Sequence, residues 1–382
     1  MILNDIAWAH YRIVLYNELY RVLKTDKVNF KVVHIASFSN MYESIYDATE
    51  SCTHKYPYVL LFNKNFDETR LLQRIFFSIK EIVKFMPNVL VVHGYYDVSL
   101  FIAVITAKLL NVKIIVSIDS TEFDKSRMLY KEIYKTIFLK LCDAAFCPGS
   151  AAKKYIQKLK MEKSRIFIVN LTPDYKTIEK VWLETFKNRE EIKRKNNFRP
   201  YNFLYVGRLS KEKNLEMLIR SFSRLKNENN NYEDWGLIIV GSGQEEAELK
   251  RNVRGLNIPG IFFTGKKKLK EVLIYYAISD VLVLPSMGDT WGIVVNEAMI
   301  CGLPVIVSNK CGSAYDLVKE NGFIFDPNDD NNLTEIMLKF VNKEVSASEM
   351  GEKSKDIIRE YSPEASAKQF LQGIDQVLSK TK

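Results

Sequence analysis

The stretch GDTWGIVVNEAMICGLPVIV (residues 288–307) places a glutamate within an otherwise apolar segment. The run VLVLPS before it has the composition of a buried strand, and MGDT that of a loop. We expect a helix from about Trp291 to Cys301, because Gly302 can cap its C-terminus and Pro304 cannot continue it. The run PVIVS predicts the next buried strand. Strand, loop, helix and strand in this order indicate a parallel α/β sheet.

Glu297 stands on this expected helix among apolar side chains. At about 100° per residue, it falls between Ile293 and Ile300 on one flank and between Val294 and Cys301 on the other. A carboxylate buried without a partner destabilises the fold considerably, so another group must hydrogen-bond it. An ion pair with a lysine or arginine, an exposed helix edge, or the hydroxyl groups of a bound ligand would each meet this requirement.

The same alternation of elements extends along the chain and predicts its domains. A length of 382 residues favours two domains over one. Strand-like runs alternate with helical periodicity in residues 1–172 and in residues 201–361, which predicts two doubly wound parallel-sheet domains facing a cleft. Residues 173–200 are charged, lack a strand-like run and predict a linker with a solvated helix. Residues 362–382 predict a C-terminal helix that can pack back on the first domain.

Composition narrows the class of protein without naming a ligand. The net charge of +9 suits an anionic ligand, an anionic membrane surface or nucleic acid. Five cysteines without CxxC or zinc-like spacing predict buried free thiols in a reducing compartment. The N-terminal sequence MILNDIAWAHYR lacks the order of a signal peptide, and polar residues interrupt the longest apolar region, residues 88–118. We therefore expect a cytoplasmic protein.

Asp289 lies eight positions before Glu297, in the loop just beyond a buried strand. The carboxyl ends of such strands are where α/β sheets hold ligands. This acidic pair resembles the signature of glycosyltransferase family 4, in which seven residues separate an acidic residue, usually glutamate, from a glutamate. The segments YVGRLSKEKNLEMLI, IIVGSGQEE, YYAISDVLVLPS and GIVVNEAMICGLPVIVS extend the resemblance across residues 201–326. The resemblance implies a GT-B fold of two Rossmann-like domains and a hexosyltransferase-like, nucleotide-sugar-dependent enzyme.

Arg208 and Lys213 follow the strand-like run FLYV. A sugar donor's diphosphate gains negative charge at the leaving oxygen as the glycosidic bond breaks, so fixed cations there stabilise the transition state more than the ground state. The planar fork of arginine donates two hydrogen bonds to a phosphate at once. Ordinary surface charge is the alternative for both residues. The resemblance implies that they bind the diphosphate, next to Gly207.

The resemblance also assigns the contacts of the donor's other parts. Asp289 would contact hydroxyl groups of the donor sugar, and Glu297 those of the ribose. The backbone at Thr264 and Gly265 would lie near the base. The remaining donor-binding candidates supply amides at the N-terminus of the expected helix, where anions are attracted: Trp291, Gly292 and Ile293.

The first domain carries fewer recognisable candidates. His93 ends the run NVLVVHG and is either a satisfied core histidine or a catalytic residue that enters the cleft and contacts a sugar. Asp119, which ends KIIVSID, is a weaker candidate of the same kind. Many family members carry a glycine-rich loop near the start, whereas this chain has NDIAWAHYRIV. The acceptor, a glycan or a lipid-linked molecule, is expected to bind this domain.

We expect no metal ion and no cofactor, because the donor is a substrate, no Asp-x-Asp motif is present, and two cations can serve the diphosphate. NDDNN (residues 328–332) predicts a solvated turn. Members of the resembled family retain the anomeric configuration of the sugar. A nucleotide-sugar epimerase and a non-catalytic glycan- or nucleotide-binding subunit stay open as alternatives. Nucleic-acid binding is disfavoured, because basic residues are dispersed among acids without an aromatic stacking motif.

Residues 151–165, AAKKYIQKLKMEKSR, combine lysines with Tyr155, Ile156 and Leu159. A solvated helix that covers the sheet is one interpretation. The other is a basic, partly apolar surface that rests on anionic lipid, which would place the protein peripherally at the inner membrane face.

Overall fold

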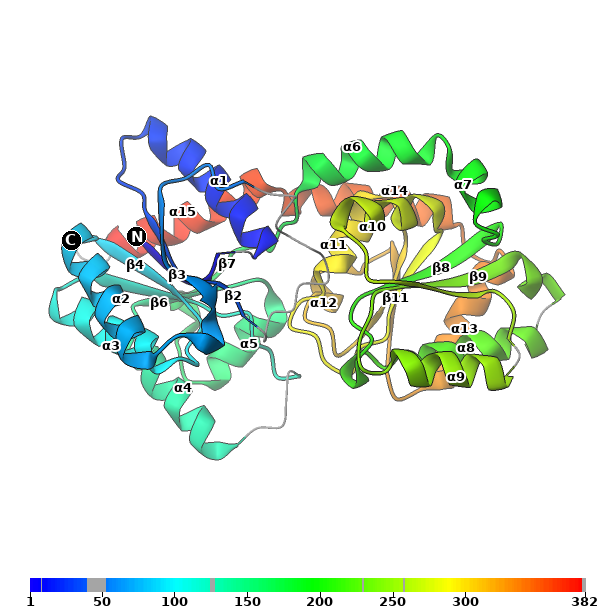
Figure 1. Cartoon of the computed structure of the whole chain (residues 1–382), viewed down its shortest axis with the longest axis horizontal. Coiled ribbons are helices and arrows are strands. Elements are labelled where there is room, and N and C mark those ends of the chain that lie inside the picture. Colours follow the sequence, from blue (N-terminus) through cyan, green and yellow to red (C-terminus); the bar gives the residue numbers. More distant parts are fainter. Residues whose placement is uncertain (8, 40–52, 124–127, 229, 257, 380–382) are drawn as a thin grey trace. The chain divides into compact units, whose positions relative to one another are not determined.

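The computed structural model of the chain divides into two compact units (Figure 1). Unit 1 is built from the described parts of residues 1–172 together with residues 363–379, and unit 2 is built from residues 173–362. Each unit is a parallel sheet covered by helices. The structure describes residues 1–7, 9–39, 53–123, 128–228, 230–256 and 258–379.

The sheet of unit 1 has seven parallel strands in the order β3-β2-β1-β4-β5-β6-β7. Buried aliphatic residues dominate its central strands, as parallel strands covered on both faces require. The strand order reverses between β1 and β4, which makes their carboxyl ends the switch point of this sheet. The strands are β1 (Ile2–Ile6), β2 (Val32–Phe38), β3 (Tyr58–Asn65), β4 (Val89–His93), β5 (Lys113–Ser117), β6 (Ala144–Cys147) and β7 (Ile166–Ile168).

Two apolar cores lie on opposite faces of this sheet. One core contains Ile82, Phe138 and Ile156 from helices between the strands, and the other contains Tyr16 and Phe370. Helix α15 thus completes unit 1 from the far end of the chain. The helices are α1 (His10–Thr25), α2 (Leu71–Phe85), α3 (Val98–Leu109), α4 (Leu129–Leu141), α5 (Ser150–Lys158) and α15 (Pro363–Ser379), with short 3-10 turns η3 (Phe66–Glu68) and η4 (Lys163–Arg165).

The sheet of unit 2 has six parallel strands in the order β10-β9-β8-β11-β12-β13. Its strand order reverses between β8 and β11, so the loops after these two strands emerge side by side at the switch point. The strands are β8 (Tyr201–Val206), β9 (Trp235–Val240), β10 (Ile261–Gly265), β11 (Val281–Leu284), β12 (Val305–Ser308) and β13 (Gly322–Phe325).

The helices of unit 2 follow the βαβ pattern expected from the sequence. They are α6 (Tyr175–Phe186), α7 (Arg189–Lys195), α8 (Leu215–Glu228), α9 (Glu246–Leu256), α10 (Leu269–Ile278), α11 (Ile293–Ile300), α12 (Ala314–Leu317), α13 (Asp330–Val341) and α14 (Ala347–Ile358), with 3-10 turns η5 (Lys211–Lys213), η6 (Asn230–Asp234) and η7 (Arg359–Tyr361).

Residues 173–200 differ from the linker that their polar composition predicts. They form α6 and α7, which pack against α10 within unit 2. Ile178 and Trp182 are buried on α6, and an Arg189 guanidinium nitrogen lies 2.7 Å from an Asp280 carboxylate oxygen. The segment thus has a buried apolar face and an ion pair in addition to its exposed charges. Its average composition does not reveal either of them.

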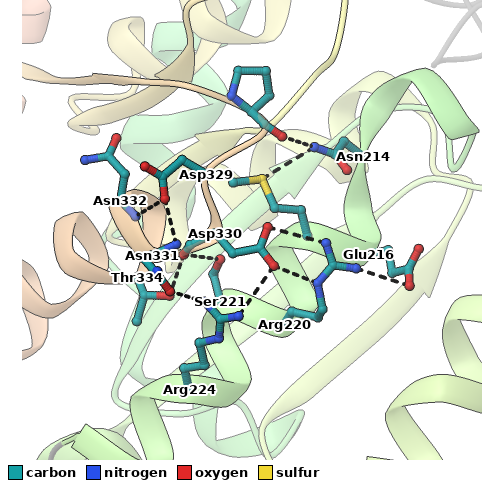
Figure 2. Close-up of polar contacts among 12 residues, drawn as sticks. Asn214, Glu216, Arg220, Ser221, Arg224, Asp329, Asp330, Asn331, Asn332 and Thr334 are labelled. Atoms are coloured by element: carbon teal, nitrogen blue, oxygen red, sulfur yellow. Dashed lines mark hydrogen bonds and ion pairs between the residues drawn. The ribbon is translucent and has the colours of Figure 1, made fainter.

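Residues 328–332 also differ from the predicted solvated turn. The Asp329 carboxylate accepts hydrogen bonds from the amides of Asn331 and Asn332 and thereby caps α13. Figure 2 shows that Asp330 holds this helix to α8, because its carboxylate lies 2.7 Å from Arg220 Nε and its carbonyl accepts a bond from Ser221. The segment is therefore the start of a packed helix.

Four cysteines in the described part of the chain are buried free thiols: Cys142, Cys147, Cys301 and Cys311. Cys52 lies outside the described residues. No helix in the described ranges is long and apolar enough to cross a bilayer. The same ranges contain no cluster of three or more His, Cys, Asp or Glu side chains that could hold a metal ion.

Candidate functional site

Lys213 and Asp289 meet at the switch point of the unit 2 sheet. Lys213 ends η5, which follows β8, and Asp289 lies in the loop after β11. The Lys213 ammonium nitrogen lies 2.6 Å from an Asp289 carboxylate oxygen, and the two side chains are only 12% and 15% exposed. The Asp289 backbone is itself fixed, because its amide donates to Lys310 and its carbonyl accepts from Gly312. The structure thus brings together two predicted site residues that lie far apart in the sequence.

Arg208 comes shortly before Lys213 in the sequence but is more open to solvent. Its side chain is 43% exposed, and one guanidinium nitrogen lies 3.2 Å from a Glu212 carboxylate oxygen. The same carboxylate oxygen accepts a bond from the Ser210 hydroxyl. The Arg208 carbonyl accepts a 2.7 Å bond from the Tyr205 hydroxyl, which fixes the backbone after β8. Glu212 was not among the predicted site residues, although its four-residue spacing from Arg208 could have indicated the pair.

Glycines let the loops after β8 and β9 approach one another closely. A Cβ added to Gly241 would lie 1.9 Å from the carbonyl oxygen of Gly207. A Cβ added to Gly243 would lie 2.3 Å from the carbonyl oxygen of Leu209. Backbone packing therefore explains the glycines of VGSGQEE without a bound dinucleotide.

Gly292 sets the start of α11. Its backbone adopts φ +79°, and an added Cβ would lie 2.8 Å from both the Cys311 sulfur and a Leu284 methyl group. The helix begins at Ile293, two residues later than expected, because the left-handed residue interrupts the helical turn. The first amides of a helix have no intrahelical acceptor, so this end can receive an anion.

The side chain of Trp291 belongs to the core. The indole is 2% exposed, and its N–H donates a 2.8 Å bond to the side-chain oxygen of the fully buried Asn296. Only the backbone of Trp291 is therefore placed to serve a ligand.

Glu297 is buried, as the helical wheel predicts, and is 1% exposed. The hydroxyl of Tyr276, on α10, donates a 2.8 Å bond to its carboxylate. The sequence analysis missed this tyrosine, since YYAIS carries no signal that distinguishes it from an ordinary apolar helix residue. Burial first, and then the charge of Glu297, raise the pKa of the neighbouring Cys301 thiol well above its ordinary value.

Thr264 and Gly265 end β10, two strands away from β8 in the sheet. Gly265 adopts φ +75°, and nothing lies within 4 Å of where its Cβ would be. Its carbonyl accepts a 3.0 Å bond from the amide of Gly241. These residues share the edge of the sheet with Lys213 and Asp289 but are not in hydrogen-bond contact with them.

His93 lies at the carboxyl end of β4 in unit 1 and is 7% exposed. Its Nε2 atom lies 2.5 Å from the Tyr16 hydroxyl oxygen. Burial first, and then the charge of Arg12 and the neighbouring imidazole of His34, lower the pKa of His93 well below its ordinary value. The ring is thus neutral at physiological pH.

A charged cluster lies beside His93; it contains Asp119, which was a predicted candidate, and Arg12 and Asp5, which were not. Arg12 contacts the carboxylate of Asp5, donates a 2.7 Å bond to Asn4 Oδ1, and lies 3.8 Å from the carboxylate of Asp119. Arg12, His93 and Asp119 line one cavity of unit 1. The segment NDIAWAHYRIV therefore supplies an anion, Asp5 on β1, and a cation, Arg12 on α1.

The basic segment 151–165 has no apolar solvent face. Tyr155, Ile156 and Leu159 are all buried, because α5 turns them toward the sheet. The amphipathic pattern is therefore that of a covering helix. The prediction that apolar side chains of this segment contact lipid is therefore wrong.

Comparisons with known proteins agree with this arrangement. The model of the glycosyl transferases group 1 family matches residues 188–357. An uncharacterized glycosyltransferase of Haemophilus influenzae is 32% identical over 208 residues, which cover 51% of this chain and 57% of the relative. Sulfoquinovosyl transferase SQD2 of Arabidopsis thaliana is 32% identical over 151 residues, which cover 38% of this chain and 28% of the relative. The matches thus span about half of these relatives or less.

The likeness in fold covers nearly the whole chain. A crystal structure of Anabaena Alr3699/HepE in complex with UDP superposes with a TM-score of 0.75 at 13% identity, and 98% of this chain and 99% of that chain are covered. Two parallel-sheet units with this likeness make the fold GT-B, as the sequence resemblance implies. The match to the glycosyl transferases group 1 family model, residues 188–357, lies within unit 2, which carries Lys213 and Asp289.

Proposed function

We propose that the protein is a retaining glycosyltransferase that moves a sugar from a nucleotide-diphosphate donor to a glycan or lipid-linked acceptor, without a metal ion. The largely buried pair of Lys213 and Asp289 carries this proposal. At this switch point the cation Lys213 can bind the diphosphate of a sugar donor, and the anion Asp289 can bind its sugar. These two parts of the donor flank the bond to be broken.

Lys213 and Arg208 are the groups we assign to the diphosphate. As the glycosidic bond breaks, negative charge grows on the leaving phosphate oxygen, and a cation fixed nearby stabilises that state more than the bound substrate. Arg208 is exposed enough for a ligand to reach it, and its planar fork suits a phosphate. These two cations would take the part that a divalent ion plays elsewhere.

Asp289 holds Lys213 until the donor arrives. When a diphosphate shares the ammonium group, the carboxylate can turn its lone pairs to hydroxyl groups of the sugar. A carboxylate accepts hydrogen bonds but donates none when ionised, so it orients hydroxyl donors. The fixed backbone of Asp289 keeps this carboxylate at the strand end.

Glu297 is assigned to the ribose. A carboxylate can accept about four hydrogen bonds, so the bond from Tyr276 is compatible with further bonds from the ribose hydroxyl groups. Tyr276 then orients the carboxylate before the nucleotide binds. The amides of Trp291, Gly292 and Ile293 would face the phosphate or sugar, and the backbone at Thr264 and Gly265 the base.

The acceptor is assigned to unit 1, where Arg12, His93 and Asp119 line one cavity. His93 is neutral there, so it can donate or accept one hydrogen bond with a sugar hydroxyl. We assign the removal of the acceptor's proton to the donor phosphate, as retention of configuration without a protein nucleophile would require.

A screen of UDP-, GDP-, ADP- and dTDP-sugars tests the proposal. Release of free nucleoside diphosphate with one donor, and transfer of its sugar with the anomeric configuration retained, is the expected result. Formation of an epimer without an acceptor would identify the protein as an epimerase. Binding without turnover under all conditions would identify a non-catalytic subunit.

A further inference from the structure

Three neighbouring helices of unit 1, α2, α3 and α4, expose large apolar side chains to solvent. Leu72, Leu109 and Leu129 are 78%, 80% and 78% exposed. We call the set the α2–α4 surface; it consists of Leu72, Phe76, Val83, Val98, Ile105, Leu109, Leu129, Tyr130, Ile133 and Ile137. Monomeric proteins rarely expose contiguous apolar patches of this kind without a binding role.

Topology places the three helices on one side of the sheet. They connect β3 to β4, β4 to β5 and β5 to β6, and each of these connections runs in the same direction across the sheet. Right-handed crossovers therefore put all three on the same face. Helix α3 packs against both α2 and α4, and the three lie together in Figure 1. Their outward residues form one surface.

The exposed apolar residues of α4 recur at regular helical spacing. On α4, Leu129, Ile133 and Ile137 recur every four residues and are exposed, while Phe138 and Leu139 are buried beneath them. A helix that covers a sheet normally turns polar residues to water on its outer side. This helix is apolar on its outer side as well as its inner side.

The charge left unpaired on the α2–α4 surface is positive, although Asp97 and Asp143 beside the helix ends pair with Arg74 and Lys108. The three helices contain seven basic residues and two acidic ones. Both acids are neutralised, because Glu81 pairs with Lys31 at 2.5 Å and Glu132 pairs with Lys135 at 2.7 Å. Four exposed lysines form no ion pair with any residue that the structure describes: Lys80, Lys84, Lys131 and Lys140.

We propose that the α2–α4 surface docks on an anionic lipid bilayer. Apolar side chains would enter the headgroup boundary while the lysines contact anionic headgroups, as on interfacial helices. Charge argues against a second copy of the chain as the occupant. A two-fold interface would set the lysine-rich patch against itself, and protein interfaces are depleted in lysine. The inference does not depend on the proposed reaction, since docking needs no substrate.

Cosedimentation of the full chain with vesicles tests the proposal. Vesicles of phosphatidylcholine with phosphatidylglycerol should bind the protein, and vesicles of phosphatidylcholine alone should bind it weakly. The triple variant Leu109→Gln, Ile133→Gln, Ile137→Gln should lose about tenfold in binding to the anionic vesicles. Lys131→Gln with Lys140→Gln should weaken binding and reduce its sensitivity to salt.

Matched variants elsewhere provide the controls. Val28→Gln, Leu183→Gln and Leu378→Gln also replace exposed apolar residues, and Lys180→Gln with Lys187→Gln removes two exposed lysines. These should bind vesicles like the unmodified protein. Equal binding by the α2–α4 triple variant and its control would overturn the proposal. So would self-association without lipid, measured by sedimentation equilibrium, that the triple variant abolishes.

Discussion

The hydroxyl of Tyr276, on α10, donates a 2.8 Å hydrogen bond to the carboxylate of Glu297, on α11. The carboxylate therefore has a partner before any nucleotide arrives. A site of this kind is preorganised, because the acceptor atoms are already aimed when the ligand binds.

Tyr276→Phe should leave Glu297 with one hydrogen bond fewer in a buried place. We expect the free energy of unfolding to fall by about 1–3 kcal/mol and affinity for the free nucleoside diphosphate to fall as well. Urea unfolding and calorimetry measure the two effects. A double-mutant cycle with Glu297→Gln gives the coupling, and a coupling of zero in both measurements would remove the positioning role.

Glu297→Ala and Asp289→Ala should separate nucleotide binding from sugar transfer. The ribose is present in donor and product alike, so loss of Glu297 should weaken binding of the bare nucleoside diphosphate. Loss of Asp289 should spare that binding and damage transfer. Titration calorimetry with the bare nucleotide decides, and equal losses of affinity would contradict the division of roles.

Arg208→Ala and Lys213→Ala should each lower turnover by about a hundredfold or more, because each removes charge that matters most as the diphosphate leaves. Lys211→Ala, in the same 3-10 turn as Lys213, is the matched control and should keep its rate. Steady-state kinetics with the best donor from the screen gives the comparison. Rates like those of the control in either variant would remove the phosphate assignment.

Transfer should persist in EDTA. In the proposed mechanism Arg208 and Lys213 neutralise the diphosphate in place of a metal ion, so chelation should change the rate less than about twofold. Assays with EDTA and with added manganese or magnesium check this. Loss of activity that either metal restores would contradict metal-free catalysis.

Acid should destabilise unit 1 through its buried histidines. Burial lowers the pKa of His93 well below its ordinary value, and burial followed by the charge of His54 lowers that of His34 to about 3. The unfolded chain binds protons at these rings below about pH 6.5, whereas the folded chain does not. The free energy of unfolding should therefore fall as pH drops below that value, by about 1.4 kcal/mol per pH unit for each ring.

Urea unfolding of the full chain at a series of pH values measures this slope. His93→Gln should make the slope shallower below about pH 6.5. An unchanged slope in the variant would show that His93 is protonated in the folded protein.

The sequence predicted the fold well because long apolar runs such as VLVLPS and PVIVS report burial on both faces of a parallel sheet. It predicted the burial of Glu297 for the same reason. It could not predict Tyr276 or Tyr16 as partners, because each hydrogen bond joins elements far apart in the chain. Nor could composition show that α6 covers an apolar face, since two buried side chains, Ile178 and Trp182, suffice to fix it.

Backbone conformation and helix capping explain the smaller differences between the predicted and the observed starts of helices. The helix after Gly292 starts late because the glycine adopts a left-handed conformation that the sequence pattern does not display. A helix begins within residues 328–332 because Asp329 serves as its N-cap. In the sequence, this N-cap cannot be distinguished from a turn, because all five residues are polar.

Unit 1 is built from two separate parts of the chain, because helix α15 joins it from the C-terminal end. The ring centroids of Phe370 on α15 and Phe146 on the sheet lie 4.7 Å apart. On the ribosome, residues 173–362 emerge before this helix does. Unit 2 can therefore complete its fold while one face of the unit 1 sheet is covered by α1 but still lacks α15. Until then the nascent protein exposes the apolar surface around Phe146, and this interval is when chaperones would be needed most.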